Sequence, residues 1–253
     1  MERGIDPRDY TLVAFGGAGP LHAPFLLREL ALSSVLVPAH PGLFSAAGLV
    51  AADVRVDDSQ TILRVMDPSI QGALADWYRA AGGRLRRRLR DDGIPASRIR
   101  LVASADCRYV GQGYELNVPL DGAARSALRN AAGDFHLLHA AAYDHANPEE
   151  PVEIVTVRLS AFGALPRPAP ATTRRGARKA PAASAGGTRP LLLPGHRGRM
   201  RARLFRREEL RAGNHLVGPA VVEQMDATTL VLPGQVARVD SHGNMWITEG
   251  PGG

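Results

Sequence analysis

The stretch that most constrains the fold is residues 11–30, which read TLVAFGGAGPLHAPFLLREL. Its first five residues are apolar and β-prone, which is typical of a short buried strand. Three glycines, Gly16, Gly17 and Gly19, follow at once and allow the backbone to turn sharply. Pro20 suits the first turn of a helix, and apolar residues recur after it at helical spacing. The stretch therefore predicts a strand, a glycine turn and a helix.

A glycine turn of this kind has a chemical use, because the start of a helix presents free N–H groups and a partial positive charge to an anion or a polar ring edge. The turn is not a P-loop, since no Gly-Lys-Ser/Thr closes it. It also lacks the third glycine of a dinucleotide fingerprint, where His22 stands instead. His22 is a candidate contact for a phosphate or a metal. The alternative is that the turn and the histidine are purely structural.

The segments that follow predict more of an α/β sheet. A second short strand is expected at residues 33–37, and the order strand, helix, strand indicates a right-handed parallel crossover. Residues 54–64 alternate in part between polar and apolar side chains and predict a further strand. We therefore assign residues 1–66 to one domain that contains the glycine turn.

An α+β subdomain is predicted for residues 67–164. A helix-start signal, Asp67-Pro68-Ser69, is followed by apolar residues at helical spacing up to Leu89. Two adjacent glycines, Gly82 and Gly83, are expected to weaken or kink this helix. The pattern continues with a hairpin over residues 98–118, a helix over residues 123–143 and a strand over residues 151–162.

The charge of the chain is concentrated in residues 165–190, which are rich in Pro, Ala, Arg and Gly. Six cationic residues and no acidic residue lie there, and they account for the whole formal net charge of +6. Ordering this segment would cost on the order of 1.5 kcal/mol per residue, with little apolar surface to offset it. We therefore predict a disordered linker, with neither nucleic acid nor a membrane as its partner. Residues 191–253 hold short β-prone runs between turn signals and predict a small all-β domain.

Histidines are the side chains with the best claim to chemistry. Asp134, His136, His139 and His145 lie on or near one predicted helix, and His136 and His139, three residues apart, share a face of it. A metal site would need a further ligand from another element, so packing or an interface is the preferred role. The sequence assigns no specific role to the three histidines and offers no other pattern of metal ligands.

The remaining reactive side chains favour structural roles. Cys107 has no histidine paired with it in the sequence, which indicates a structural thiol. Glu223 and Asp226 are a carboxylate pair that we interpret as surface turn residues. A single cysteine excludes an internal disulfide and suits the cytoplasm. No stretch approaches the roughly 20 apolar residues of a membrane span, and the first ten residues lack the apolar core of a secretion signal.

Five segments of the chain, taken in their order along the sequence, carry a resemblance to a known family. They are DPRDYTLVAFGGAGPLHA, VPAHPGLFSAAGLVAADVRVD, RYVGQGYELNVPL, FHLLHAAAYDHANPEEPVEIVTVRLSAFG and GPAVVEQMDATTLVLPG. In this order they resemble the hydantoinase A / 5-oxoprolinase family of ATP-dependent cyclic-amide hydrolases, whose relatives include acetone and acetophenone carboxylase subunits. The resemblance covers most of the chain except residues 165–190.

The resemblance implies that the chain is the C-terminal portion of a hydantoinase A-type subunit with an actin-like (sugar kinase/Hsp70-like) ATPase fold. Residues 1–66 would belong to the second half of that fold, followed by the α+β subdomain and the small β domain. Gly16, Gly17, Ala18 and Gly19 would then hold the adenosine side of ATP, with Mg as the accompanying metal. The first phosphate loop of the family, an Asp-Gly-Gly-Thr type of motif, does not occur in the chain.

The resemblance also implies a reaction and partners. ATP phosphorylates the carbonyl oxygen of a cyclic amide, and water then opens the ring; with 5-oxoproline as substrate, the reaction would belong to glutathione metabolism. The implied partners are the N-terminal half of the same subunit and a hydantoinase B-type subunit or domain. Since the chain lacks the first phosphate loop of the family, we expect little or no turnover from it alone. The alternatives are a non-catalytic assembly fragment and a subunit of an ATP-dependent ketone carboxylase.

Overall fold

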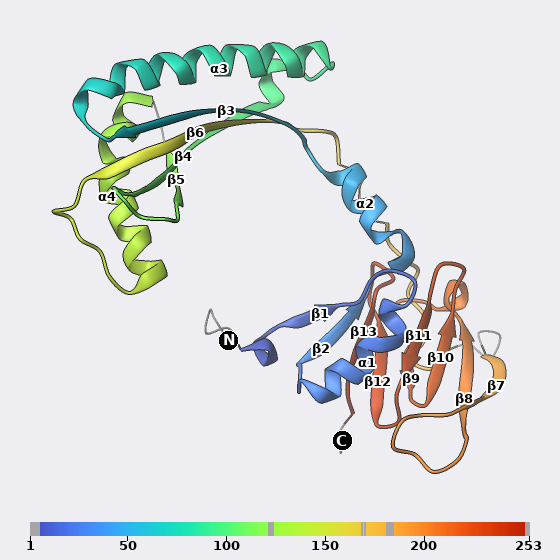
Figure 1. The fold of residues 1–253 in the computed structure, drawn as a ribbon. Coiled ribbons are helices and arrows are strands. Elements are labelled where there is room, and N and C mark those ends of the chain that lie inside the picture. The colour runs from blue at the N-terminus through green and yellow to red at the C-terminus, as the bar shows by residue number, and fades with distance from the viewer. Residues whose placement is uncertain (1–5, 121–123, 168, 170, 181–184, 251–253) are drawn as a thin grey trace. The chain divides into compact units, whose positions relative to one another are not determined.

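The computed structural model describes residues 6–120, 124–167, 169, 171–180 and 185–250, with the side chains of 124–129 and 185 left out. The chain divides into two compact units (Figure 1). Unit 1 is formed by Met1–Val50 together with Arg167–Gly253. Unit 2 is the continuous segment Ala51–Pro166.

Unit 1 contains two sheets, a helix that packs against them, α1 (Gly19–Glu29), and a second helix with no buried residue, α2 (Phe44–Ala51), whose last residue falls in unit 2. The strands are β1 (Thr11–Val13), β2 (Ser34–Val37), β7 (Ala185–Leu191), β8 (Met200–Arg206), β9 (His215–Val217), β10 (Ala220–Glu223), β11 (Thr228–Val231), β12 (Gln235–Val239) and β13 (Met245–Glu249).

The predicted strand, glycine turn and helix are present. β1 pairs in parallel with β2, with Leu12 opposite Val35, and α1 connects the two strands. The helix turns Ala23 and Leu27 toward the protein interior, where they share a core with Val35 and Val37 of β2. Apolar residues at helical spacing thus bury one side of α1 against the sheet, as the sequence pattern predicts.

The prediction of a separate domain at residues 191–253 was wrong. The first sheet has the strand order β1-β2-β13-β12-β9, so the C-terminal strands extend the sheet that begins with β1 and β2. β13 pairs antiparallel with β2, and Ile247 lies opposite Val35. A two-stranded sheet is only marginally stable, and β13 and β12 supply the further strands and the buried apolar face that it requires.

The second sheet of unit 1 has the strand order β11-β10-β8-β7. Helix α1 contacts β11 of this sheet as well as β2 and β13 of the first, as Figure 1 shows. Phe205, Ala220 and Val231 of the second sheet join the same hydrophobic core as Leu27 of α1. The glycine turn therefore belongs to a body built from both ends of the chain.

Much of the expected disordered linker at residues 165–190 is ordered where the structure describes it. Thr173 N–H donates to the Ser241 carbonyl at 2.9 Å, and Gly176 N–H donates to the Ala212 carbonyl at 2.8 Å. The Asn214 side chain donates to the Ala177 carbonyl at 2.5 Å. Backbone pairing with unit 1 thus orders a segment whose own side chains bury little apolar surface.

Unit 2 is an α+β unit with one antiparallel sheet of order β3-β6-β4-β5. The helices α3 and α4 contact each other, and they pack against β6 and β5 respectively (Figure 1). The elements are β3 (Val54–Val65), α3 (Gln71–Asp91), β4 (Ile99–Tyr109), β5 (Leu116–Leu120), α4 (Ala124–Tyr143) and β6 (Val152–Gly163).

The boundary between the first two predicted domains was misplaced. β3 pairs along its length with β6, so it belongs to unit 2, which begins at Ala51 rather than after residue 66. The partial alternation of β3 identified a strand but gave no information on its partner. The predicted hairpin is confirmed: β4 pairs antiparallel with β5, and Gly111 adopts a φ of 85° in the connection.

The glycine pair in α3 does not interrupt the helix, which is continuous over Gln71–Asp91. A Cβ atom built on Gly82 would lie 3.0 Å from Leu101 Cδ1 and 3.7 Å from Leu159 Cδ2, whereas one on Gly83 would have nothing within 4 Å. Gly82 therefore allows α3 to approach the sheet closely. The expected kink is therefore absent, and the expected weakening of the helix stays a prediction.

Candidate functional site

The glycine turn lies between β1 and α1 and is held against a second loop. Gly16 has a φ of 79°, a backbone conformation that residues other than glycine adopt only at a cost in free energy. Its N–H donates to the Pro41 carbonyl at 2.7 Å, which joins the turn to the loop that follows β2. The neighbouring Ala14 N–H donates to the Leu36 carbonyl at 2.8 Å. The position of the turn is therefore set by backbone bonds on both sides of Phe15.

The tip of the turn presents backbone donors to solvent. Gly17 and Ala18 are exposed, and no hydrogen bond between described residues uses the N–H of either one. Ala18 is the N-cap of α1 and provides no side-chain cap. Two free N–H groups at the positive end of a helix dipole are suited to a polar or anionic ligand group.

Gly17 is not required by the fold itself. Its φ lies outside the left-handed region, and a Cβ atom there would meet only the Asp226 carbonyl oxygen, at an ordinary 3.5 Å. A side chain at this position would instead project into the space beside the free N–H groups. The lack of a side chain at Gly17 leaves the backbone of the turn open to close approach.

Asp226 makes contacts near the glycine turn that the sequence interpretation did not anticipate. Its Oδ2 accepts the N–H of Gly42 at 2.9 Å, so it braces the loop that holds the glycine turn. Gln224 Nε2 donates to Asp226 Oδ1 at 2.6 Å and to the Ala39 carbonyl at 3.2 Å. Asp226 lies in the turn between β10 and β11 and is partly exposed, as expected, but no local pattern in the sequence indicates that these strands carry it to the N-terminal loops. Only the non-local pairing of the strands reveals this.

The other member of the carboxylate pair is a surface residue, as predicted. Glu223 forms an ion pair with Arg189 at 2.9 Å between two partly exposed side chains. Such pairs contribute little to stability.

His22 lies on the first turn of α1 with its side chain exposed. The side chain makes no hydrogen bond with any other described residue, and its backbone N–H bonds to the Ala18 carbonyl at 3.4 Å. The imidazole is thus free to meet a ligand at the glycine turn. Its role as a phosphate or metal contact stays a prediction.

The predicted histidine group forms a packed network in unit 2. His139 is fully buried; its ring lies between Tyr109 and Tyr143, with centroid distances of 4.9 and 4.8 Å. Its Nδ1 contacts the His145 carbonyl at 2.7 Å, and its Nε2 contacts Gln112 Nε2 at 2.9 Å. A carbonyl only accepts, so Nδ1 carries the proton and Nε2 accepts from Gln112. This is a neutral structural histidine.

His136 and Asp134 differ from His139 in position. The Tyr109 hydroxyl accepts the Asn147 N–H at 2.8 Å and lies 2.9 Å from His136 Nδ1, so it can donate its own proton to that nitrogen. Asp134 is exposed and forms no part of this network. The preferred interpretation of packing thus fits His136 and His139. Within the described ranges, no three His, Cys, Asp or Glu side chains come together as a metal site.

Cys107 has the properties of a structural thiol. It is fully buried on β4, and burial, with Asp106 nearby, raises the pKa of the thiol to about 12. The thiolate needed for nucleophilic attack is therefore not populated near neutral pH.

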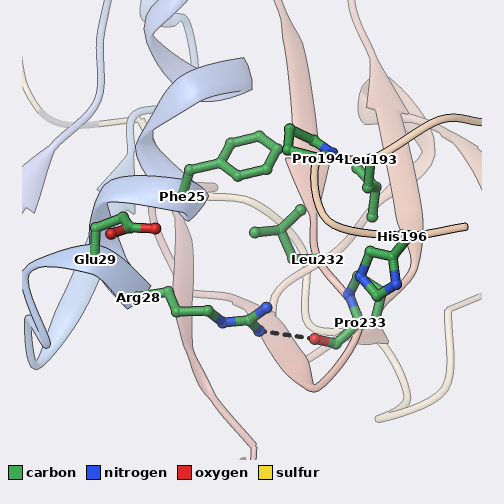
Figure 2. Close-up of a pocket in the computed structure, with 8 residues that line it drawn as sticks. All are labelled: Phe25, Arg28, Glu29, Leu193, Pro194, His196, Leu232 and Pro233. Carbon is green, nitrogen blue, oxygen red and sulfur yellow. Dashed lines mark hydrogen bonds between the residues drawn. The ribbon is translucent and has the colours of Figure 1, made fainter.

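A small pocket of about 140 Å³ lies at the opposite end of α1 from the glycine turn (Figure 2). Phe25 and Arg28 of α1 face Leu193, Leu232 and Pro233 across it, and Arg28 Nη2 donates to the Pro233 carbonyl at 2.8 Å. Ligand pockets are usually about 300 Å³ or larger. The pocket is thus a minor hollow at the surface and not an extension of the glycine turn.

Unit 1 thus defines a class of α/β protein in which an exposed glycine turn is braced from the C-terminal part of the chain. The chain belongs to the hydantoinase/oxoprolinase family: the model of that family matches residues 1–58, and the model of its C-terminal domain matches residues 68–249. The resemblance in the sequence motifs is confirmed.

Individual relatives agree with this assignment. Caprolactamase subunit alpha of Pseudomonas jessenii is 32% identical and covers 99% of this chain, which spans 36% of that relative. The 5-oxoprolinase 1 of Arabidopsis thaliana is 26% identical over 98% of this chain and 19% of its own length. The chain therefore spans about a third or less of these relatives.

Two solved structures share the fold. The crystal structure of ATP-dependent caprolactamase from Pseudomonas jessenii has a TM-score of 0.76 at 30% identity, covering 99% of this chain and 37% of that chain. Nucleotide-free acetone carboxylase has a TM-score of 0.78 at 23% identity, covering 97% of this chain and 36% of that chain. The second likeness shows the fold alone. No helix among the described residues is long and apolar enough to cross a membrane.

Proposed function

We propose that the chain supplies one side of the nucleotide site of an ATP-dependent enzyme that opens a cyclic amide. The observation that carries the proposal is the turn of Gly16, Gly17, Ala18 and Gly19, in which Gly17 and Ala18 are exposed and their N–H groups donate to no described residue. Support comes from family membership and from the 32% identity to a caprolactamase subunit. Unit 1 would belong to the actin-like half-domain that the family resemblance implies.

The nucleotide fits the residues that are present. Gly17 and Ala18 offer two N–H donors, and the space beside Gly17 contains no side chain. A bound nucleotide would supply the phosphoryl group that makes an amide carbonyl a better electrophile for water. No group of acidic or histidine side chains among the described residues is arranged to hold Mg²⁺, so no step through the metal follows from this chain.

The surroundings of the turn support a site that a further part of the enzyme completes. Phe15, Leu43 and Phe44 are between 42% and 53% exposed, and the two aromatic rings lie 5.5 Å apart. Helix α2 is apolar yet has no buried residue. Exposed apolar patches mark interaction surfaces. We propose the N-terminal half of the same subunit as the covering partner, and a hydantoinase B-type subunit as a second partner in the reaction.

Calorimetric titration of the purified chain with ATP and Mg²⁺ tests the nucleotide site. We expect saturable binding by the wild type and at least tenfold weaker binding by Gly17→Val, whose side chain would occupy the ligand space. Gly83→Ala, a glycine substitution outside the turn whose Cβ atom would have nothing within 4 Å, is the control and should bind as the wild type does. If neither the chain nor its mixture with the N-terminal half binds ATP, the proposal is wrong.

Turnover separates the remaining functions. We expect little or no ATP-dependent lactam hydrolysis by the chain alone, and hydrolysis once the N-terminal half and a B-type subunit are added. Product analysis with a ketone, bicarbonate and ATP tests the carboxylase alternative. Co-purification with the N-terminal half but no ATP binding would favour an assembly fragment.

A further inference from the structure

The glycine turn is bonded to the loop after β2, which contains Pro41 and Gly42. Both the turn and this loop contact Asp226, which lies between β10 and β11. Gly16 N–H donates to the Pro41 carbonyl at 2.7 Å. The following residue, Gly42, donates its N–H to Asp226 Oδ2 at 2.9 Å. A chain of direct contacts thus runs from the turn through the second loop to Asp226.

The contact between Gly42 and Asp226 is unusually close. A Cβ atom on Gly42 would lie 2.7 Å from both the Cβ and the backbone oxygen of Asp226, and 3.0 Å from Oδ2. Atoms at such distances overlap, so glycine is required at this position. Asp226 also places its backbone oxygen beside Gly17, 3.5 Å from where a Cβ atom would be. One residue therefore contacts both sides of the base of the turn.

Gln224 holds the Asp226 carboxylate in place. Its Nε2 bridges Asp226 Oδ1 at 2.6 Å and the Ala39 carbonyl at 3.2 Å. Its own Oε1 is buried and has no hydrogen-bond partner in the part of the chain that the structure describes. The carboxylate accepts one bond on each oxygen, and a charged acceptor strengthens both.

We infer that Asp226 is a positioning residue of the nucleotide site, which it serves by holding the loop at Gly42 and, through Pro41, the glycine turn. The inference rests on the proposed function, because it assigns Asp226 a part in nucleotide affinity. It also implies that the C-terminal third of the chain, which contains Asp226, is needed for binding.

The first experiment compares Asp226→Ala with the wild type by calorimetry with ATP and Mg²⁺. We expect at least about tenfold weaker binding, since loss of a hydrogen bond to a charged group has an effect of that size. Met225→Ala is the matched control, because the neighbouring Met225 side chain is 99% exposed. Wild-type affinity in Asp226→Ala, or an equal loss in Met225→Ala, would overturn the inference.

A conservative variant separates positioning from a general loss of folding. Asp226→Asn keeps an acceptor for Gly42, and its amide can donate to Gln224 Oε1 if that side chain rotates, which gives up only the longer bond of 3.2 Å from Gln224 Nε2 to the Ala39 carbonyl. We expect binding close to that of the wild type in Asp226→Asn, with unfolding midpoints near the wild-type value in both variants. Strong loss of binding in Asp226→Asn would show that the charge, and not the position, is what matters.

Amide hydrogen exchange at Gly16 and Gly42, measured without nucleotide, tests the contact independently of the proposed function. We expect faster exchange at both amides in Asp226→Ala and wild-type rates in Met225→Ala. Faster exchange combined with no ATP binding by the wild type would contradict the proposed function but leave the contact established. Unchanged exchange combined with intact ATP binding would contradict this inference alone.

Discussion

Individual glycines in this chain have different reasons to be glycine. Gly16 has a positive φ, Gly42 faces the Asp226 side chain, and Gly82 lies against Leu101. Gly17 and Gly83 have neither constraint. A sequence shows five glycines of equal appearance, whereas conformation and close contacts identify which ones the fold requires. For Gly17, the proposed nucleotide site supplies a reason for its small size that the fold itself does not.

The adjacent glycines of α3 provide a direct test of this distinction. Gly83→Ala should stabilise the protein by up to about 1 kcal/mol, because alanine is the better helix former and its Cβ meets open space. Gly82→Val should destabilise it by about 1–3 kcal/mol, because the added atoms overlap Leu101 and Leu159. Urea denaturation measures both differences. Equal effects at the two positions would mean that α3 does not pack closely at Gly82.

At the scale of single elements, the turn between β12 and β13 depends on one carboxylate. Asp240 accepts the backbone N–H groups of His242 and Asn244 at 2.8 and 2.9 Å, and the Trp246 indole N–H at 3.0 Å. Burial acts to raise the pKa of Asp240, but hydrogen bonds from Trp246 and Asn244 outweigh it and hold that pKa below its usual value. The ionised form is therefore preferred in the folded state.

This preference predicts a dependence of stability on pH. A carboxyl with a lowered pKa in the folded state stabilises the protein above its unfolded pKa of about 3.9, and the effect is lost as the pH falls through the folded value. Asp240→Ala should therefore reduce the free energy of unfolding by about 1 kcal/mol at pH 7, allowing for partial exposure. The difference should shrink below pH of about 4. Denaturation at several pH values, followed by Trp246 fluorescence in a Trp77→Phe background, would measure it. A difference that stays constant with pH would argue against the ionised Asp240.

A second prediction at the scale of elements concerns the contact of α4 with the connection between β4 and β5 and with the loop after α4. His139 connects Gln112 to the His145 carbonyl from a fully buried position. His139→Ala should lower the free energy of unfolding by about 2–4 kcal/mol, because it creates a cavity and leaves two polar groups without partners. His145→Ala is the control, since the His145 backbone carbonyl is retained and its side chain is exposed. Comparable losses from both variants would contradict the central role of His139.

Local patterns in the sequence predicted these elements well and their partners poorly. The strands at β1, β2, β4, β5 and β6 and the helices α1 and α3 follow directly from periodicity and turn signals. The pairing of β13 with β2 and of β3 with β6 joins residues that lie far apart in the chain. No local pattern encodes those partners, and the contacts of Asp226 were not anticipated for the same reason. The free N–H groups of the glycine turn were predictable because they depend on a single local turn.

At the scale of the whole molecule, the chain leaves unit 1 at Val50, builds unit 2 continuously over Ala51–Pro166, and returns to complete unit 1. Unit 2 has its own hydrophobic core, which includes Leu85, Phe135 and Ile154. Unit 1 buries Val35 and Val37 against Met245 and Ile247 across the β2–β13 pair. Unit 2 is therefore built from one continuous segment, whereas unit 1 needs two segments that lie far apart in the sequence.

This difference predicts the behaviour of fragments. The fragment 51–166 should fold alone, because every strand of its sheet and its whole core lie within it. The fragment 191–253 should not, because β13 would lose β2 and expose Ile247 and Met245. Mixing fragments 1–50 and 167–253 should restore cooperative unfolding, and Val35→Asp, which places a charge in the shared core, should prevent it. Circular dichroism and thermal melts of each fragment and of the mixture would test this. A cooperative transition from 191–253 alone would contradict this prediction. It would mean that residues 191–253 form an independent β domain and do not need β2 in order to fold.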